Sequence, residues 1–135
     1  MFLQPKKTKY KKTKKKLSSL KLDYKSNKLK FGNIGIKAAT SGIITAKQIE
    51  ATRRVIVKKI NRTGKMWIRI FPDFPVTKKP TEVRMGKGKG SVHCWAANVK
   101  QGRILFEVCG IPYQKAFTAF AAGGAKLPIK TIVVF

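Results

Sequence analysis

The first thirty residues hold more like charge than a packed core tolerates. They contain twelve lysines and a single acid, Asp23, with few apolar residues between them. Because cations at this density repel one another, we expect residues 1–28 to form an extended basic arm. The folded domain must then come from residues 29–135. A disordered solubilising tail is the alternative for the arm, and a transit peptide is disfavoured because such peptides prefer Arg and Ser.

Positive charge continues along the rest of the chain and indicates a polyanionic partner. The 135 residues include 31 Lys and Arg against 5 Asp and Glu, a formal net charge of +26. A chain with this charge repels itself unless an anionic partner or a counterion cloud neutralises it. The candidate partners are nucleic acid, an anionic membrane surface and an acidic protein. No apolar run approaches the roughly 20 residues that a membrane span needs, and of these partners we expect nucleic acid and no membrane.

The same composition argues against an enzyme, a metal site and a cofactor. Structural zinc usually takes four Cys or His ligands, whereas the chain has two cysteines and one histidine. The acids are scattered singly, so no carboxylate pair is visible for acid–base chemistry. His93 and Cys94 are adjacent and would point to opposite faces of a strand, which excludes a Cys–His catalytic pair. We therefore predict no enzymatic activity.

Residues 84–90 form the most distinctive motif, with the sequence R-M-G-K-G-K-G. Gly86, Gly88 and Gly90 would leave the backbone bare and let RNA approach it closely, while the cations between them face phosphate oxygens. We expect a basic loop over residues 84–91, held between strands at 82–85 and 91–99. A solvated lysine-rich turn is the alternative. A Walker A loop is excluded because glycine follows the second lysine where that motif needs Ser or Thr.

Thr45 and Gln48 form a capping-box pattern that predicts the start of a helix. Apolar residues then recur at helical spacing as far as Ile60. The other faces of this helix are basic, and Glu50 can pair with Arg54 at i,i+4. A solvated basic face is common in proteins, but we expect three of these cations to contact phosphate. They are Arg53, Arg54 and Lys58.

Alternating and apolar runs predict the remaining elements. We expect strands at 29–39, 65–71, 91–99, 103–109 and 129–135, and a second helix at 112–125 whose inner face carries Phe117, Phe120 and Ala121. Three prolines predict a stiff loop without regular structure at 72–80.

Two features of these strands lead to sharper expectations. A turn at Gln101-Gly102 would pair the third and fourth strands and place Cys94 opposite Cys109, both reduced. Trp67, Arg69 and Phe71 share one strand face, which is suited to base stacking. Burial under a helix is favoured over stacking for the two aromatic residues.

Five motifs then follow one another along the chain. They are L-Q-P-K-K-T-K-Y at 3–10, T-A-K-Q-I-E-A-T-R-R at 45–54, G-K-M-W-I-R-I-F-P-D at 64–73, K-P-T-E-V-R-M-G-K-G-K-G at 79–90 and A-K-L-P-I-K-T at 125–131. Their order and content resemble bacterial-type ribosomal protein sixteen of the large subunit, the universal L-sixteen/L-ten-e family. The resemblance runs from the first residues to near the end of the chain.

The resemblance implies a fold, a role and a set of contacts. The fold would be α+β, a single α/β-hammerhead-type domain with a mixed or antiparallel sheet and two helices. The protein would be a structural constituent of the large subunit, beside other large-subunit proteins and without homo-oligomerisation. It would bind large-subunit rRNA near the central protuberance and help organise tRNA in the aminoacyl site. A free-standing basic RNA-binding regulator is the alternative.

The expected rRNA contacts combine the charged segments with the motif positions. Trp67 also matches a family motif position, and the three loop glycines are expected where the backbone meets RNA. The expected rRNA-binding cations are Lys6, Lys7, Lys9, Lys11, Lys12, Lys14, Lys15, Lys16, Arg53, Arg54, Lys58, Arg69, Arg84, Lys87 and Lys89.

The origin of the chain is also an expectation from resemblance. Met1 lies almost at the start of the family pattern, so we expect no import signal, and the frequent Lys and Ile suggest an AT-rich genome. The glycine-loop region and G-R-I-L-F-E at 102–107 resemble mitochondrially encoded relatives. We therefore expect a mitochondrial ribosome, with bacterial cytoplasm or plastid stroma as alternatives.

Overall fold

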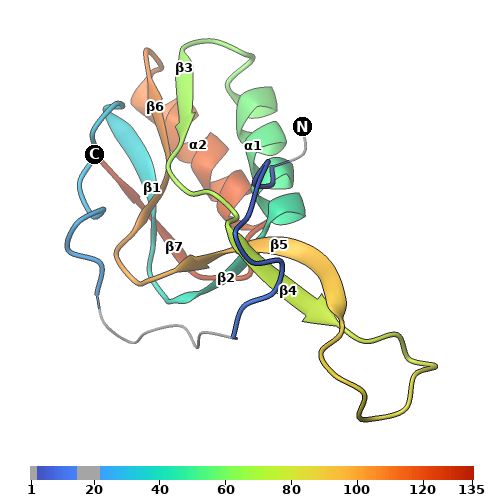
Figure 1. Ribbon diagram of the computed structural model, residues 1–135. Coiled ribbons are helices and arrows are strands. Elements are labelled where there is room, and N and C mark those ends of the chain that lie inside the picture. The colour runs from blue at the N-terminus through green and yellow to red at the C-terminus, as the bar shows by residue number, and fades with distance from the viewer. Residues whose placement is uncertain (1–2, 15–21) are drawn as a thin grey trace.

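The computed structural model describes residues 3–14 and 22–135 as a mixture of strands and helices (Figure 1). The strands are β1 Ile34–Ala38, β2 Gly42–Thr45, β3 Lys65–Ile68, β4 Phe74–Lys78, β5 Ser91–Val99, β6 Ile104–Cys109 and β7 Thr131–Val134, and the helices are α1 Ala46–Lys59 and α2 Tyr113–Gly124. This arrangement confirms the α+β prediction.

The strands divide between two antiparallel sheets. The larger sheet has the order β3-β6-β1-β7, and the smaller one has the order β2-β5-β4. The two helices lie side by side behind the larger sheet in Figure 1, with α2 against β1 and β7 and α1 against β2 and β5. The core lies between the helices and the sheets.

Helix α1 begins where its sequence predicted. The Thr45 side chain accepts a hydrogen bond from the Gln48 backbone N–H, and the Gln48 side chain accepts one from the Thr45 N–H at 2.9 Å. Ile49 and Ile56 are fully buried against the sheets. Thr52, which is not part of the apolar pattern, is also buried. Its hydroxyl is satisfied there by donating a hydrogen bond to the Gln48 carbonyl at 2.9 Å.

The inner face of α2 differs from the prediction. Phe120 is buried as expected, but Phe117 is about half exposed and Ala121 is also exposed. Ala116 and Ala119 occupy the inner face instead. Small side chains there let α2 lie close to α1 and the sheet. The predicted face was therefore rotated from the real one.

The predicted hairpin of residues 91–99 and 103–109 was wrong. Strand β5 pairs with β2 and β4, whereas β6 pairs with β1 and β3 in the other sheet. Cys94 lies opposite Val76, and Cys109 lies opposite Lys65, and both thiols are free. The chain turns at Gly102, where φ is +89°, and passes from one sheet to the other. The turn was recognised, but it does not join two paired strands.

The proline-rich stretch contains a strand that was predicted to be a loop. Residues Phe74–Lys78 form β4, with Pro75 opposite Trp95 of β5, and residues 82–85 form no strand. Because β4 is at the edge of its sheet, a proline without an N–H group is tolerated there. The β4–β5 hairpin therefore carries a longer loop, residues 79–90.

The second face of the larger sheet is organised by one buried acid, Glu107 of β6. Its carboxylate accepts hydrogen bonds from the backbone N–H groups of Lys30, Phe31 and Gly32 at 3.2, 2.7 and 2.8 Å, and from the Arg69 guanidinium. Burial on its own would raise the pKa of Glu107, but these donors outweigh it and lower the pKa below its usual value. The carboxylate is therefore charged, and it fixes residues 30–32 against the sheet.

Replacing Glu107 by Gln should destabilise the fold by about 1.5–3 kcal/mol at pH 7, the range for hydrogen bonds to a charged group. Because folding lowers the pKa of Glu107, its contribution is complete above the ordinary Glu pKa of about 4.3 and is lost as pH falls through the folded-state value. The stability gap between wild type and variant should narrow below about pH 4. Urea unfolding at pH 7 and pH 3 measures this gap.

Glu82→Gln is the matched control, because Glu82 is exposed in the loop. It should change stability by less than about 0.5 kcal/mol. A Glu107→Gln variant as stable as this control at pH 7 would contradict the role assigned to the carboxylate.

Candidate nucleic-acid interface

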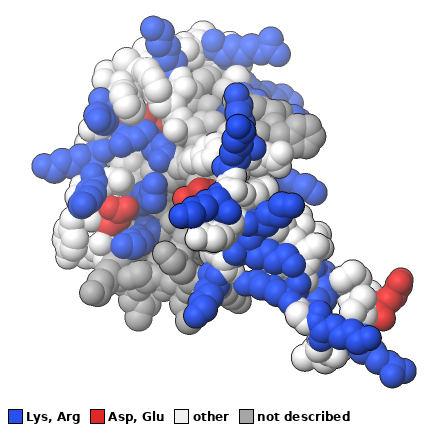
Figure 2. Space-filling view, in the orientation of Figure 1, with Lys and Arg blue, Asp and Glu red and all other residues white. Residues whose placement is uncertain are grey.

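The β4–β5 hairpin carries the glycine loop away from the body of the molecule (Figure 1). Loop residues 79–90 include four cations and one acid, Glu82. Residues 81–89 are all exposed. In Figure 2, Lys and Arg side chains follow the hairpin from the body to the end of the loop. The loop is thus a projecting segment with a strong positive charge.

The three loop glycines fall into two groups. Gly86, Lys87 and Gly88 have φ angles of +102°, +50° and +88°, and a β-carbon built on either glycine meets nothing within 4 Å. A β-carbon at Gly90 would lie 2.6 Å from the Lys78 carbonyl oxygen. Gly86 and Gly88 therefore leave open backbone at the tip of the loop. At Gly90, the close contact between the two sides of the hairpin at its base leaves no room for a β-carbon, which explains why glycine occupies this position.

The basic arm lies against this loop. The Lys12 ammonium group donates to the Lys89 carbonyl at 2.9 Å, and the Lys89 ammonium group donates to the Thr13 carbonyl. Nearer its start, Leu3 packs on the core, and it lines with Gln4 a groove of about 700 Å³ between α1 and β5. The arm therefore runs from α1 to the hairpin loop and joins two of the expected RNA-binding regions.

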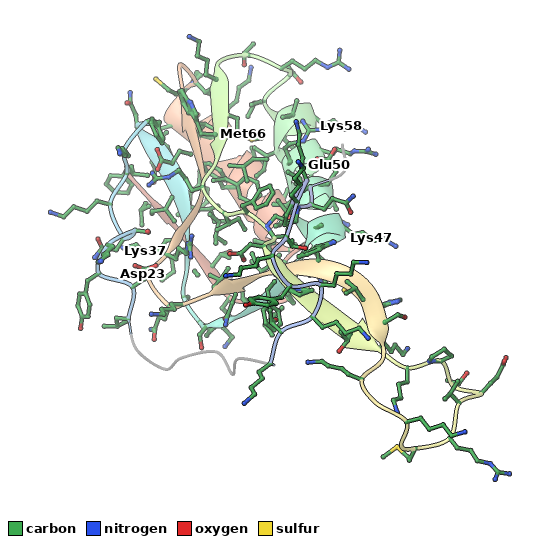
Figure 3. The ribbon with its side chains drawn as sticks, viewed as in Figure 1. Asp23, Lys37, Lys47, Glu50, Lys58 and Met66 are labelled. Atoms are coloured by element: carbon green, nitrogen blue, oxygen red, sulfur yellow. The ribbon has the colours of Figure 1, made fainter. Side chains whose placement is uncertain are left out.

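Two of the three expected cations of α1 bind Glu50. Arg53 binds both oxygens of that carboxylate at 2.7 Å, and Arg54 binds one of them at 3.0 Å. The hydrogen bond from Arg53 is the largest cause that lowers the pKa of Glu50 to about 2. The predicted pair of Glu50 with Arg54 is confirmed, and Arg53 joins it. The Arg54 side chain is 69% exposed. Lys58 is also exposed and points away from the body in Figure 3.

Arg69 occupies a different setting from the other expected cations. Its side chain is only 17% exposed and is paired with buried Glu107. Trp67 was expected to be buried under a helix. Its ring instead stacks against the ring of Phe31. The sequence pattern could not identify this cluster, although a lone acid in the apolar run I-L-F-E-V was a signal for it. Of the expected arm cations, Lys15 and Lys16 lie outside the described residues.

Within residues 3–14 and 22–135, no group of three or more His, Cys, Asp and Glu side chains is placed to hold a metal ion. In the same ranges, neither helix has the length and apolar character needed to cross a membrane.

Comparison with known proteins identifies the family. The pattern of ribosomal protein L16p/L10e matches residues 5–134. The chain belongs to this family. Large ribosomal subunit protein uL16 of Francisella tularensis subsp. holarctica (strain FTNF002-00 / FTA) is 53% identical over 132 residues, covering 98% of this chain and 96% of that protein. The uL16 proteins of subsp. novicida (strain U112) and subsp. tularensis (strain SCHU S4 / Schu 4) are 52% identical over 132 residues, with the same coverage.

Family membership decides several expectations. As an L16p/L10e protein, the chain is a structural constituent of the large ribosomal subunit and not an enzyme. The expected mitochondrial origin is not supported, because these relatives are bacterial, which fits the alternative of bacterial cytoplasm. The resemblance to mitochondrial relatives had rested on short stretches and on base composition. An AT-rich genome is equally compatible with a bacterium.

The two groups of glycines predict different effects on stability. Gly90→Ala should lower the free energy of unfolding by about 1–3 kcal/mol, because its β-carbon would displace the Lys78 carbonyl at the hairpin base. Gly88→Ala should cost about 1 kcal/mol or less, since only the positive φ is strained and the exposed loop relaxes. Thermal and urea unfolding of both variants would compare them. Equal stabilities would mean that the Gly90 contact does not hold the hairpin.

Proposed function

We propose that this chain binds large-subunit rRNA through one continuous basic surface, formed by the arm, the glycine loop and the exposed side of α1. The observation that carries the proposal is the contact between arm and loop. The reciprocal bonds of Lys12 and Lys89 hold two lysine-rich segments together, although like charges repel. The acceptors in these bonds are neutral carbonyls, so both positive charges remain to be neutralised by an anion from outside.

The acids of the chain do not supply that anion. Arm residues 3–14 contain none, and loop residues 79–90 contain only Glu82. Phosphate groups of RNA are anions at regular spacing, and Lys and Arg are their usual protein contacts. The proposal covers the arm lysines, Arg53, Arg54, Lys58, Arg84, Lys87 and Lys89. It omits Arg69, because that side chain is only 17% exposed and is paired with a fully buried carboxylate, Glu107.

The finer position in the subunit is part of the same proposal. From the family resemblance, we infer a site near the central protuberance, with the loop close to tRNA in the aminoacyl site. The projection of the hairpin from the body supports this inference, because a projecting loop reaches beyond the surface that binds the first layer of RNA (Figure 1). The bare backbone at Gly86 and Gly88 also suits close contact with another chain.

Binding of the full chain to large-subunit rRNA should weaken steeply with salt, since each neutralised phosphate releases counterions. Lys87→Ala/Lys89→Ala should reduce the slope of log K against log[salt] by roughly 1 to 2, at about 0.7–0.9 per lost contact. The control is Lys115→Ala/Lys126→Ala, which removes the same charge from exposed positions on and just after α2. If both double variants lowered the slope equally, the loop would have no special contact with phosphate.

Backbone shape at the loop tip should matter in the assembled subunit more than for overall affinity. Gly88→Val should leave the protein able to enter the large subunit, because the loop is open there, but should impair tRNA accommodation or final assembly. The loop lysines are replaceable in part, since the chain has 31 basic residues, whereas the backbone conformation is not. Subunit incorporation and translation rate would be compared with Lys87→Ala/Lys89→Ala. Normal translation with Gly88→Val would reduce the loop to a basic turn.

A further inference from the structure

One exposed aromatic side chain is backed by a cationic and aromatic cluster. The ring of Phe31 is stacked on Trp67, with 6.1 Å between ring centroids and an interplanar angle of 23°. The Arg69 guanidinium lies 5.1 Å from the Phe31 centroid, and the Lys30 ammonium group lies 5.7 Å from it. Phe31 is nevertheless 51% exposed. The ring is therefore supported by its neighbours and open to a further stacking partner.

The backbone beneath Phe31 is fixed more firmly than a loop usually is. The Glu107 carboxylate accepts the N–H groups of residues 30, 31 and 32, and it also pairs with Arg69. A β-carbon at Gly32 would come within 2.6 Å of the Val108 carbonyl, so this segment lies very close to β6. A binding group held in place before the ligand arrives loses less conformational entropy on binding.

We propose that Phe31 is a stacking platform for an unpaired nucleobase of the rRNA. Single-stranded nucleotides are commonly bound by stacking a base on an aromatic ring, with nearby cations for the phosphates. Phe31 supplies the ring, and exposed Lys28 and Lys30 supply charge beside it. The ligand class is an unpaired nucleotide, which rests on the proposed binding of rRNA and extends it to a base contact.

Three other exposed aromatic residues of the body lie in a different setting. The Tyr113 ring contacts those of Phe117 and Phe135, with centroid separations of 6.2 Å and 5.6 Å. In the part of the chain that the structure describes, no cation lies over these rings, whereas two lie over Phe31. A partner that stacks on Phe31 must accept neighbouring positive charge. A nucleotide meets that condition, and an apolar protein surface does not.

The test uses large subunits assembled with the full-length chain carrying Phe31→Leu, Phe31→Tyr or Phe117→Leu. Chemical probing of the base faces of the rRNA then compares each variant with wild type. With Phe31→Leu, at least one unpaired nucleotide should become about fivefold or more as reactive, the lower end expected for loss of one base stack. Phe31→Tyr keeps the ring and should restore protection. Phe117→Leu removes a ring of similar exposure and should change nothing.

The outcomes separate this inference from the proposed rRNA binding. If wild-type chain fails to bind rRNA in a salt-dependent way or to enter the subunit, the proposed function fails. If all variants enter the subunit and no base changes its reactivity with Phe31→Leu, only the stacking inference is overturned. Unchanged reactivity together with weaker retention of Phe31→Leu would also overturn it, since that result indicates a protein partner. Thermal unfolding of each free variant confirms that it is folded.

Discussion

The buried carboxylate of Glu107 connects three parts of the chain that are far apart in sequence: residues 30–32, Arg69 and strand β6. An isolated charge inside a protein costs several kcal/mol, so the fully buried position of Glu107 in β6 requires donors. Those donors are the backbone of residues 30–32 and the guanidinium of Arg69, which approach from different segments. The same bonds fix the backbone that leads from the arm into β1. The segment that joins the highly charged arm to β1 therefore has a defined position on the body.

Fixing this joining segment would not by itself set the path of the arm, because the arm lysines repel the rest of the molecule. Two further features hold the arm against the body. Leu3 buries apolar surface beside α1, and the Lys12–Lys89 contact attaches the arm to the hairpin loop. The Asp23 N–H donates to the Gln101 carbonyl and the Ile104 N–H donates to the Ser26 carbonyl, which holds the last part of the arm on the body. The basic surface thus has a shape before any RNA is present.

What the sequence predicted well was local in the chain. The α1 cap depends on Thr45 and Gln48, three residues apart, and the cation cluster on that helix depends on Glu50 and its i+3 and i+4 neighbours. What it missed depends on distant partners. Arg69 has the pattern of an outward cation until Glu107, 38 residues away, is placed beside it. Gly90 and Gly88 lie in the same sequence motif, but only Gly90 lies against the backbone of Lys78, at the end of strand β4.

The use of the acids explains why the basic surface must find its counter-charge elsewhere. Glu107 and Glu50 are bound to arginines, and Asp23 accepts the N–H groups of Lys25 and Ser26 in a turn. Three of the five acids therefore serve the geometry of the chain itself. Each of them lies away from the loop tip, where Arg84, Lys87 and Lys89 are exposed. A fold that uses three of its acids internally and holds the arm lysines beside the loop lysines is suited to a partner whose backbone carries a negative charge at every residue, as RNA does.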